Sequence, residues 1–198
     1  LKARVQMNLF RKLDNNGIFI KDGGIYKVEY PLNERKVNSF VYKINTLYEE
    51  YLSGMNVYYT IIPDKNYYSK ENYLKMDYDK LFSIVTNNIN SDLNYIDIRN
   101  CLTLSDYYYT DTHWKQNKIS KVVDKLSNVM NFKISNNYEE KEYYPFYGVY
   151  YGQAALKVKP DTINYLTNDV IKSAKVMDIE SDLKTVYEEE SLGKMDSY

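Results

Sequence analysis

The amino-acid sequence predicts one α/β domain, in which helices cover both faces of a parallel β-sheet to give three layers. Between residues 34 and 131, segments of helical periodicity alternate with short apolar runs, in the order helix, strand, helix, strand, helix. Strands joined by crossover helices pair in parallel. In addition, 198 residues with a mass of 23.5 kDa suffice for one α/β domain with a sizeable core, but not for two.

Residues 16–30 have the pattern of a β-hairpin that precedes this core. Two short apolar runs, 17–20 and 25–28, flank the sequence K-D-G-G, which is rich in turn-forming residues. Pro31 ends the second run, because proline cannot donate a hydrogen bond to a neighbouring strand.

The core is expected to run from residue 34 to residue 131 and to open with its most clearly patterned helix. This helix follows Glu34, and Gly54 supplies its stop. One helical face carries its apolar residues, which are Val37, Phe40, Val41, Ile44, Leu47, Tyr48, Tyr51 and Leu52.

Two buried strands and two further helices complete the expected core. The run V-Y-Y-T-I-I at 57–62 is apolar and rich in β-branched residues, and a second short strand is expected at 95–98. A helix lies between them, marked by Tyr78, Leu81, Phe82, Val85 and Ile89. The last helix is expected to begin near Thr112 or His113 and to end near Asn131.

The remaining residues have weaker patterns. The region 138–177 is aromatic, and we expect strand and turn at 143–152 and further strands at 162–166 and 170–176. The acidic tail 178–198 is expected to be ordered but peripheral, or to fray if the next part of the domain is missing.

The segment 106–119 holds the candidate catalytic residues. It contains His113, the only histidine, and places Asp111 two residues before it. A carboxylate beside a lone imidazole is typical of a catalytic triad, in which the acid accepts the Nδ1 proton and Nε2 acts as base. Residues i and i+2 of a helix point to different faces, so the pair requires a loop or a helix start. An aspartate that merely caps a helix remains the alternative.

Three neighbours are candidates for substrate contact. Lys65 follows the first expected strand and the segment 99–113 follows the second, so both lie at the carboxyl edge of the sheet, where ligands bind. Lys65 could reach an anionic substrate group, although a solvated loop lysine is the favoured interpretation. Trp114 and Tyr109 could stack on a sugar, although packing against the sheet is the alternative reading of Trp114.

Composition excludes several functions. The 26 basic and 27 acidic residues leave no footprint for nucleic acid. The single cysteine, Cys101, excludes an internal disulfide, and one histidine disfavours a zinc site, so we expect no metal and no cofactor. Cys101 as a nucleophile is a weaker hypothesis than a buried thiol. No apolar run spans a bilayer, and the first residues are not a signal peptide. The 24 tyrosines reflect either codon bias or sugar-stacking surfaces.

The sequence T-D-T-H-W at 110–114 resembles the signature of the bacterial DHHW family. Members of that family are similar to the SGNH-hydrolase-like domains of alginate O-acetyltransferases and related cell-envelope acetylation proteins. Thr112 stands where the family name has its first histidine, between the acid and the base. Further blocks at 16–24, 60–65 and 146–151, and from Lys159, are similar in order to those of the family.

The resemblance implies an SGNH-hydrolase-like (flavodoxin-like) fold, incomplete at its C-terminus. The closing K-M-D-S-Y is similar to a segment that precedes the nucleophile in the family, so we expect the catalytic serine outside this chain rather than at Ser197. These 198 residues are then inactive alone. The resemblance also implies an extracytoplasmic location, in the cell envelope or secreted.

The same resemblance implies an O-acetyltransferase or acetylesterase that modifies a polysaccharide. Its partners would be a carbohydrate and an acetyl donor, with a membrane acetyl-transfer protein as a further candidate. A non-catalytic domain that binds glycan or scaffolds an envelope complex is the main alternative, and a cytosolic small-molecule hydrolase is a distant one.

Overall fold

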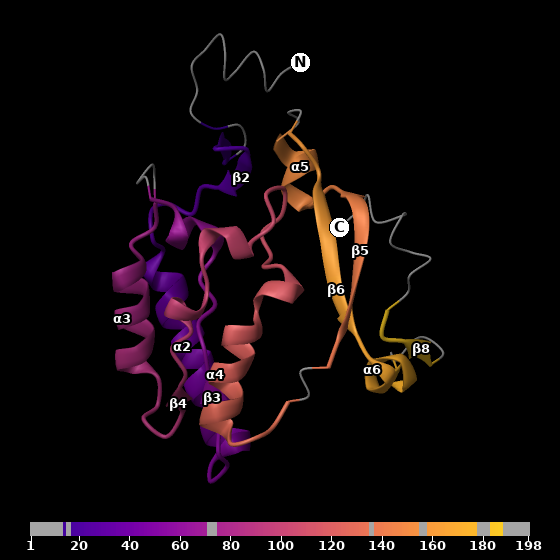
Figure 1. Cartoon of the computed structure of the whole chain (residues 1–198). Coiled ribbons are helices and arrows are strands. Elements are labelled where there is room, and N and C mark those ends of the chain that lie inside the picture. Colours follow the sequence, from indigo (N-terminus) through magenta and orange to yellow (C-terminus); the bar gives the residue numbers. More distant parts are fainter. Residues whose placement is uncertain are drawn as a thin grey trace.

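The computed structural model describes residue 14 and residues 17–70, 75–134, 137–154, 158–177 and 183–187 (Figure 1). The expected acidic tail therefore lies outside the described residues, apart from 183–187, and Ser197 lies outside them as well. No helix within the described ranges combines the length and the apolar character needed to cross a bilayer.

The predicted hairpin is confirmed. Strands β1 (Ile18–Lys21) and β2 (Gly24–Lys27) pair antiparallel, with Ile20 opposite Ile25. The turn works because Asp22 and Gly23 adopt φ values of 48° and 80°, a region that aspartate and glycine tolerate. The buried face of the hairpin packs against helix α5 (Val149–Ala154) through Tyr150.

The helix predicted from Glu34 is also confirmed. Helix α2 (Glu34–Leu47) continues as the π-helical turn η2 (Tyr48–Leu52), and Gly54 follows with a φ of 82°. The side chain of Asn33 caps α2 by accepting a hydrogen bond from the amide of Lys36. Helix α3 (Tyr78–Asn88) is capped by Asp77 in the same way.

A short parallel pair lies at the centre of the helices. Strands β3 (Tyr58–Tyr59) and β4 (Asn94–Tyr95) pair in parallel, with Tyr58 opposite Asn94. Helices α2 and α3 share one apolar cluster with Tyr59, while helix α4 (Ser120–Met130) packs on the cluster that contains Tyr58. Adjacent residues of a strand face opposite sides, so helices cover both faces of this pair.

The wide parallel sheet expected from the sequence is not present among the described residues. They form four sheets of two strands each, and only the pair β3 and β4 is parallel. The two parallel strands are also shorter than the apolar runs that predicted them, since the register pairs only Tyr58 with Asn94 and Tyr59 with Tyr95. The α/β class is confirmed, but the three-layer sheet is not.

The helix expected from Thr112 or His113 begins later, at Ser120. The chain first makes the 3-10 turns η4 (Arg99–Cys101), η5 (Leu104–Asp106) and η6 (Gln116–Lys118). The prediction was wrong at this end because periodicity marks the apolar residues of a helix and not the position of its first turn. The predicted end is confirmed, since Asn131 adopts a φ of 55°.

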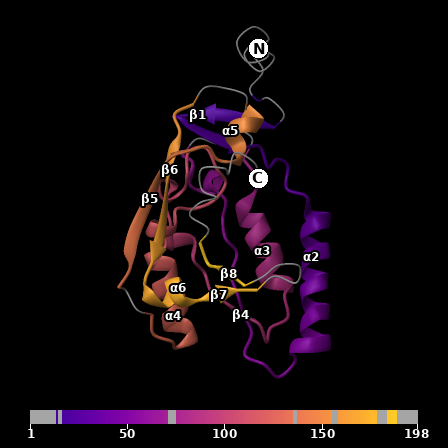
Figure 2. The same ribbon diagram turned by 90° about the vertical axis from the view of Figure 1, so that its right-hand side faces the viewer.

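The C-terminal half consists of a long antiparallel ribbon that runs beside α4 and rises to α5 (Figures 1 and 2). Its strands are β5 (Glu139–Phe146) and β6 (Asp161–Thr167), of which the second confirms the strand predicted at 162–166. Strand β5 contains the first part of the expected strand and turn at 143–152, whereas α5 replaces the second part.

The strand expected at 170–176 was wrong over most of its length. Helix α6 (Asp169–Ser173) occupies it, followed by the short strand β7 (Lys175–Val176), which pairs with β8 (Lys184–Thr185). The side chain of Asn168 accepts a hydrogen bond from the amide of Ile171, and this cap starts a helix despite the apolar sequence.

Candidate active site

The segment that carries Asp111 and His113 is a loop closed at its base. Tyr107 and Trp114 form an antiparallel bridge, and the amide of Tyr108 donates to the carbonyl of His113 over 3.2 Å. The hydroxyl of Tyr107 also donates to the carbonyl of Pro63 over 2.5 Å. This bond ties the loop to the segment that follows β3, at the edge of the parallel pair where the sequence placed the site.

Asp111 and His113 contact each other as predicted. Nδ1 of His113 lies 2.6 Å from Oδ1 of Asp111, and the same oxygen accepts the backbone amide of His113 over 2.9 Å. An ionised carboxylate only accepts hydrogen bonds, so the imidazole must carry its proton on Nδ1. The carboxylate thus fixes both the tautomer and the orientation of the ring.

The two side chains differ sharply in exposure. The side chain of Asp111 is 2% exposed, whereas that of His113 is 70% exposed. Within the described part of the chain, no group hydrogen-bonds to Nε2 of His113, and no serine hydroxyl reaches the ring. The unprotonated nitrogen is therefore available to a group that approaches from outside the loop.

Helix α5 fixes the second carboxylate oxygen. The amide of Val149 donates to Oδ2 of Asp111 over 2.8 Å, close to the first turn of the helix, where anions are stabilised. Gly148 lies directly against the carboxylate, and a Cβ atom there would come within 2.6 Å of both Asp111 Oδ2 and the carbonyl oxygen of Thr110. This position therefore requires glycine for space, not for backbone conformation.

Lys65 lies behind the loop and not at its surface. It is 4% exposed, and its ammonium donates to the carbonyls of Tyr108, Tyr109 and Asp111 over 3.0, 3.0 and 2.8 Å. Burial lowers the pKa of Lys65 to about 8, against the opposing effect of nearby carboxylates, of which Asp161 is the strongest. An ammonium group has three donors, and all three are used here. The predicted contact with an anionic substrate is therefore wrong, because the side chain supports the loop instead.

Asp161 holds the other side of the same segment. Its carboxylate accepts the amides of Tyr109 and Thr110 over 2.9 and 2.7 Å, and the hydroxyl of Thr110 over 2.7 Å. The Thr110 hydroxyl accepts the amide of Gly148 in turn, over 2.9 Å. No sequence pattern marked Asp161, Thr110 or Gly148 as part of the site, although all three lie in the blocks that resemble the DHHW family.

The two aromatic candidates differ in position. Trp114 is partly buried and packs on the cluster around Ile98 and Val122, as the alternative reading had it. Tyr109 is 54% exposed, and the ammonium of Lys115 lies 5.6 Å from the centre of its ring. Of the two, Tyr109 has the exposed ring face, so a contact with substrate stays a prediction for that residue.

Two other chemistries considered from the sequence were a Cys101 nucleophile and a metal site. Cys101 is partly buried and packs against the same apolar cluster as Trp114. In the part of the chain that the structure describes, no three side chains of histidine, cysteine, aspartate or glutamate are placed to share a metal ion.

Three solved structures have similar folds. A DHHW family protein from Eubacterium siraeum has a TM-score of 0.64 at 18% identity, over 77% of this chain and 55% of that chain. PatB1 from Bacillus cereus has a TM-score of 0.63 at 13% identity, over 84% of this chain and 64% of that chain. PatB1 with a sulfonyl adduct has a TM-score of 0.59 at 11% identity, over 84% and 62%.

These similarities concern the fold and not the sequence. No protein-family model matches the chain, and no curated protein matches it significantly. This chain spans 55 to 64% of the length of the three solved chains. The resemblance that T-D-T-H-W and the accompanying blocks carry is nevertheless confirmed in three dimensions: this chain has the fold of a DHHW family protein.

Proposed function

We propose that this chain supplies the acid–base pair of a carbohydrate O-acetyltransferase or acetylesterase of the bacterial cell envelope. One observation carries the proposal: the buried carboxylate of Asp111 holds Nδ1 of an imidazole that is otherwise exposed. A histidine that served only packing would bury its ring. An aspartate that only capped a helix would need no contact with an imidazole. The fold shared with a DHHW family protein and with PatB1 supports the same reading.

In this mechanism His113 acts as a general base toward a serine that is not among the described residues. The serine Oγ attacks the acetyl carbonyl as its proton passes to Nε2 of His113, and the tetrahedral intermediate collapses when that proton goes to the leaving alcohol. A sugar hydroxyl or water then attacks the acyl-enzyme and gives its proton to Nε2. Return of this proton to the serine completes the cycle. Asp111 keeps its negative charge throughout and stabilises the imidazolium.

The test is acetyl-ester hydrolysis, with a chromogenic acetate, by a protein extended past Tyr198 to include the proposed serine. We expect His113→Ala to reduce kcat/KM by about 10³-fold or more, since the base is lost while ester binding remains. Tyr42→Ala, on the exposed surface of α2, is the matched control and should leave the rate unchanged. Equal activity of the wild type and His113→Ala would contradict the proposal.

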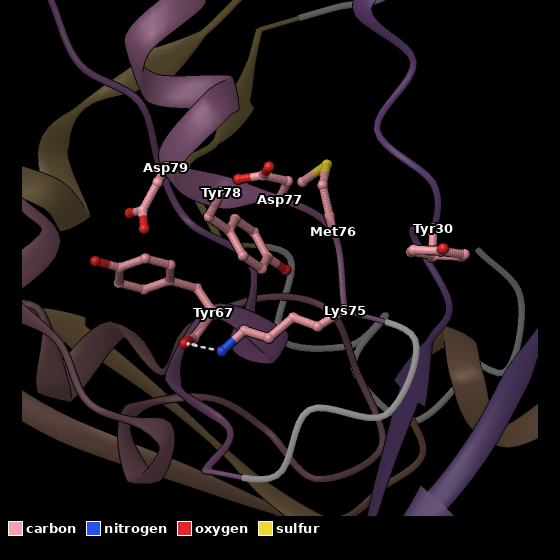
Figure 3. A pocket seen from close by; sticks show the side chains of 7 residues that line it. All are labelled: Tyr30, Tyr67, Lys75, Met76, Asp77, Tyr78 and Asp79. Carbon is pink, nitrogen blue, oxygen red and sulfur yellow. Dashed lines mark hydrogen bonds between the residues drawn. The ribbon is translucent and has the colours of Figure 1, made fainter.

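A specific observation also favours the non-catalytic alternative, glycan binding. A cavity of about 530 Å³ lies beside the start of α3 (Figure 3). Figure 3 shows Tyr30 on one side and Tyr67 and Tyr78 on the other, with Lys75 between them. Ring faces suit the apolar face of a sugar, and carboxylates accept hydrogen bonds from its hydroxyls. The lining residues are Tyr30, Tyr67, Lys75, Met76, Asp77, Tyr78 and Asp79.

This alternative predicts binding without turnover. Titration calorimetry with amino-sugar oligosaccharides should show an affinity that Tyr30→Ala weakens and Tyr42→Ala leaves unchanged. Tyr30 lines the cavity, whereas Tyr42 does not. Saturable binding together with the absence of His113-dependent hydrolysis would favour a binding domain over an enzyme.

A further inference from the structure

The loop segment 108–111 lies between two buried opposite charges. On one side the ammonium of Lys65 binds the carbonyls of Tyr108, Tyr109 and Asp111. On the other side the carboxylate of Asp161 binds the amides of Tyr109 and Thr110. Peptide carbonyls thus face the cation and peptide amides face the anion, which is the favourable orientation of their dipoles in both cases.

The convergence of three carbonyls on one point requires the cation. Carbonyl oxygens carry partial negative charge, so three of them pointed at one buried site repel each other unless a donor lies between them. No regular helix or strand produces such an arrangement within four residues. The curl of the loop from residue 108 to residue 111 is therefore organised around the Lys65 ammonium.

Lys65 is itself held from several directions, so it can act as a fixed point. It begins the 3-10 turn η3 (Lys65–Tyr68), which Asp64 caps by accepting the amide of Asn66 over 2.7 Å. The rings of Tyr26 and Tyr150, from β2 and α5, lie 5.0 and 5.3 Å from the ammonium.

We propose that Lys65 and Asp161 are positioning residues for the Asp111–His113 pair: they fix the backbone of segment 108–111 and thereby aim the Asp111 carboxylate at Nδ1 of His113. The proposal rests on the function proposed above, but it concerns the geometry of the pair and not the reaction. Lys65 binds the carbonyl of Asp111 itself, while the amide of Val149 holds only Oδ2 of that residue. Loss of the hydrogen bonds of either side chain frees the backbone, so that Oδ1 no longer holds Nδ1.

The single histidine makes a direct test possible on these 198 residues. In protein labelled with ¹⁵N-histidine, the ring nitrogen shifts and their couplings to the ring protons report the tautomer of His113 alone. We expect the Nδ1–H form to predominate in the wild type at pH 7.5. In Lys65→Met and in Asp161→Asn we expect a shift toward the Nε2–H form that an unrestrained imidazole prefers.

Lys75→Met is the matched control. The ammonium of Lys75 also donates to two backbone carbonyls, of Tyr67 and Ser69 over 2.8 and 3.2 Å, and lies near two tyrosine rings, as Figure 3 shows for Tyr67 and Tyr78. It supports a different loop, so its removal should leave the tautomer of His113 unchanged. The comparison distinguishes the effect of losing any half-buried lysine from the effect of losing Lys65.

The outcomes are distinct. A wild-type tautomer in folded Lys65→Met and folded Asp161→Asn would overturn the proposal, and failure of both variants to fold would assign the two residues to stability alone. Asp161→Asn keeps the size of the side chain and one acceptor oxygen, so its folding is expected even if Lys65→Met does not fold. Because no turnover is measured, absence of esterase activity would sink the proposed function without changing this result.

Discussion

Nδ1 of His113 lies 2.6 Å from Oδ1 of Asp111, a carboxylate that is 2% exposed beneath an imidazole that is 70% exposed. The geometry of the pair does not follow from the D-x-H sequence alone. Its acid is fixed by α5, and its backbone is held by residues from η3 and β6. Elements far apart in the chain thus converge on Asp111 and the residues just before it, and each contact can be tested.

Asp111→Asn should abolish the orientation of the imidazole while leaving the fold intact. The asparagine oxygen can still accept a hydrogen bond, but the asparagine NH₂ group can donate one instead. The side chain therefore no longer selects the Nδ1–H tautomer of His113. In a protein extended to include the proposed serine we expect a fall in kcat of about 10⁴-fold, as for the loss of the acid in a serine triad. Ester kinetics measure this, with circular dichroism as the check on folding. A loss of less than tenfold would show that the acid is not needed.

Gly148→Ala should destabilise the protein. The new Cβ would lie 2.6 Å from the carbonyl oxygen of Thr110 and from Asp111 Oδ2, and a backbone carbonyl held by a neighbouring amide cannot move aside cheaply. We expect a loss of about 1–3 kcal/mol in the free energy of unfolding. Gly152→Ala, in the helix α5 that follows Gly148, is the control, because a Cβ there meets nothing within 4 Å.

The control should be neutral or stabilising, by up to about 1 kcal/mol, since alanine favours a helix over glycine. Urea unfolding of both variants measures the difference. Equal stability of Gly148→Ala and Gly152→Ala would mean that the backbone at Asp111 yields, contrary to the fixed geometry described above.

The contribution of Lys65 to stability should depend on pH. Burial, opposed by Asp161, Asp111 and Asp64, lowers the pKa of Lys65 from 10.5 to about 8. Between these values the unfolded chain keeps a proton on Lys65 that the folded chain releases, so the free energy of unfolding rises with pH. Relative to Lys65→Met, the wild type should gain up to about 1.4 kcal/mol per pH unit above pH 8 and nothing below it.

Urea unfolding of the wild type and of Lys65→Met at pH 7, 8 and 9 tests the sign. Other titrating groups, such as the tyrosines, are common to both proteins and cancel in the difference. A difference that stayed constant over this range, or that fell as the pH rose, would contradict the lowered pKa of Lys65.

Tyr107→Phe should loosen the attachment of the loop to the parallel pair. The Tyr107 hydroxyl is buried and donates to the carbonyl of Pro63, so its removal leaves that carbonyl without its partner. We expect a loss of about 1–3 kcal/mol in the free energy of unfolding. Tyr109→Phe, at a residue that is 54% exposed, should change it by less than about 0.5 kcal/mol. Thermal or urea unfolding distinguishes the two, and equal effects would be the contrary result.

The local features of the fold were predictable from the sequence. The hairpin, α2, α3 and β6 follow from turn residues, caps and periodicity, all of which act over a few neighbouring residues. Two local predictions failed. The strand expected at 170–176 is mostly a helix, because Asn168 caps a helix in that apolar stretch. Helix α4 begins at Ser120, several residues after its expected start. The expected wide sheet depended on pairing between distant strands, which an apolar run does not specify.

The sequence by itself identified Asp111 and His113 as the candidate pair, because they are two residues apart and His113 is unique in the chain. Only the tertiary structure decided that the Asp111 carboxylate is buried, that the His113 imidazole is exposed, and that Lys65 supports the loop. The physical reason is that burial and hydrogen bonding depend on what other segments bring to a residue. Here Lys65 lies 46 residues from Asp111 along the chain, and Gly148 and Asp161 lie 38 and 51 residues from Thr110.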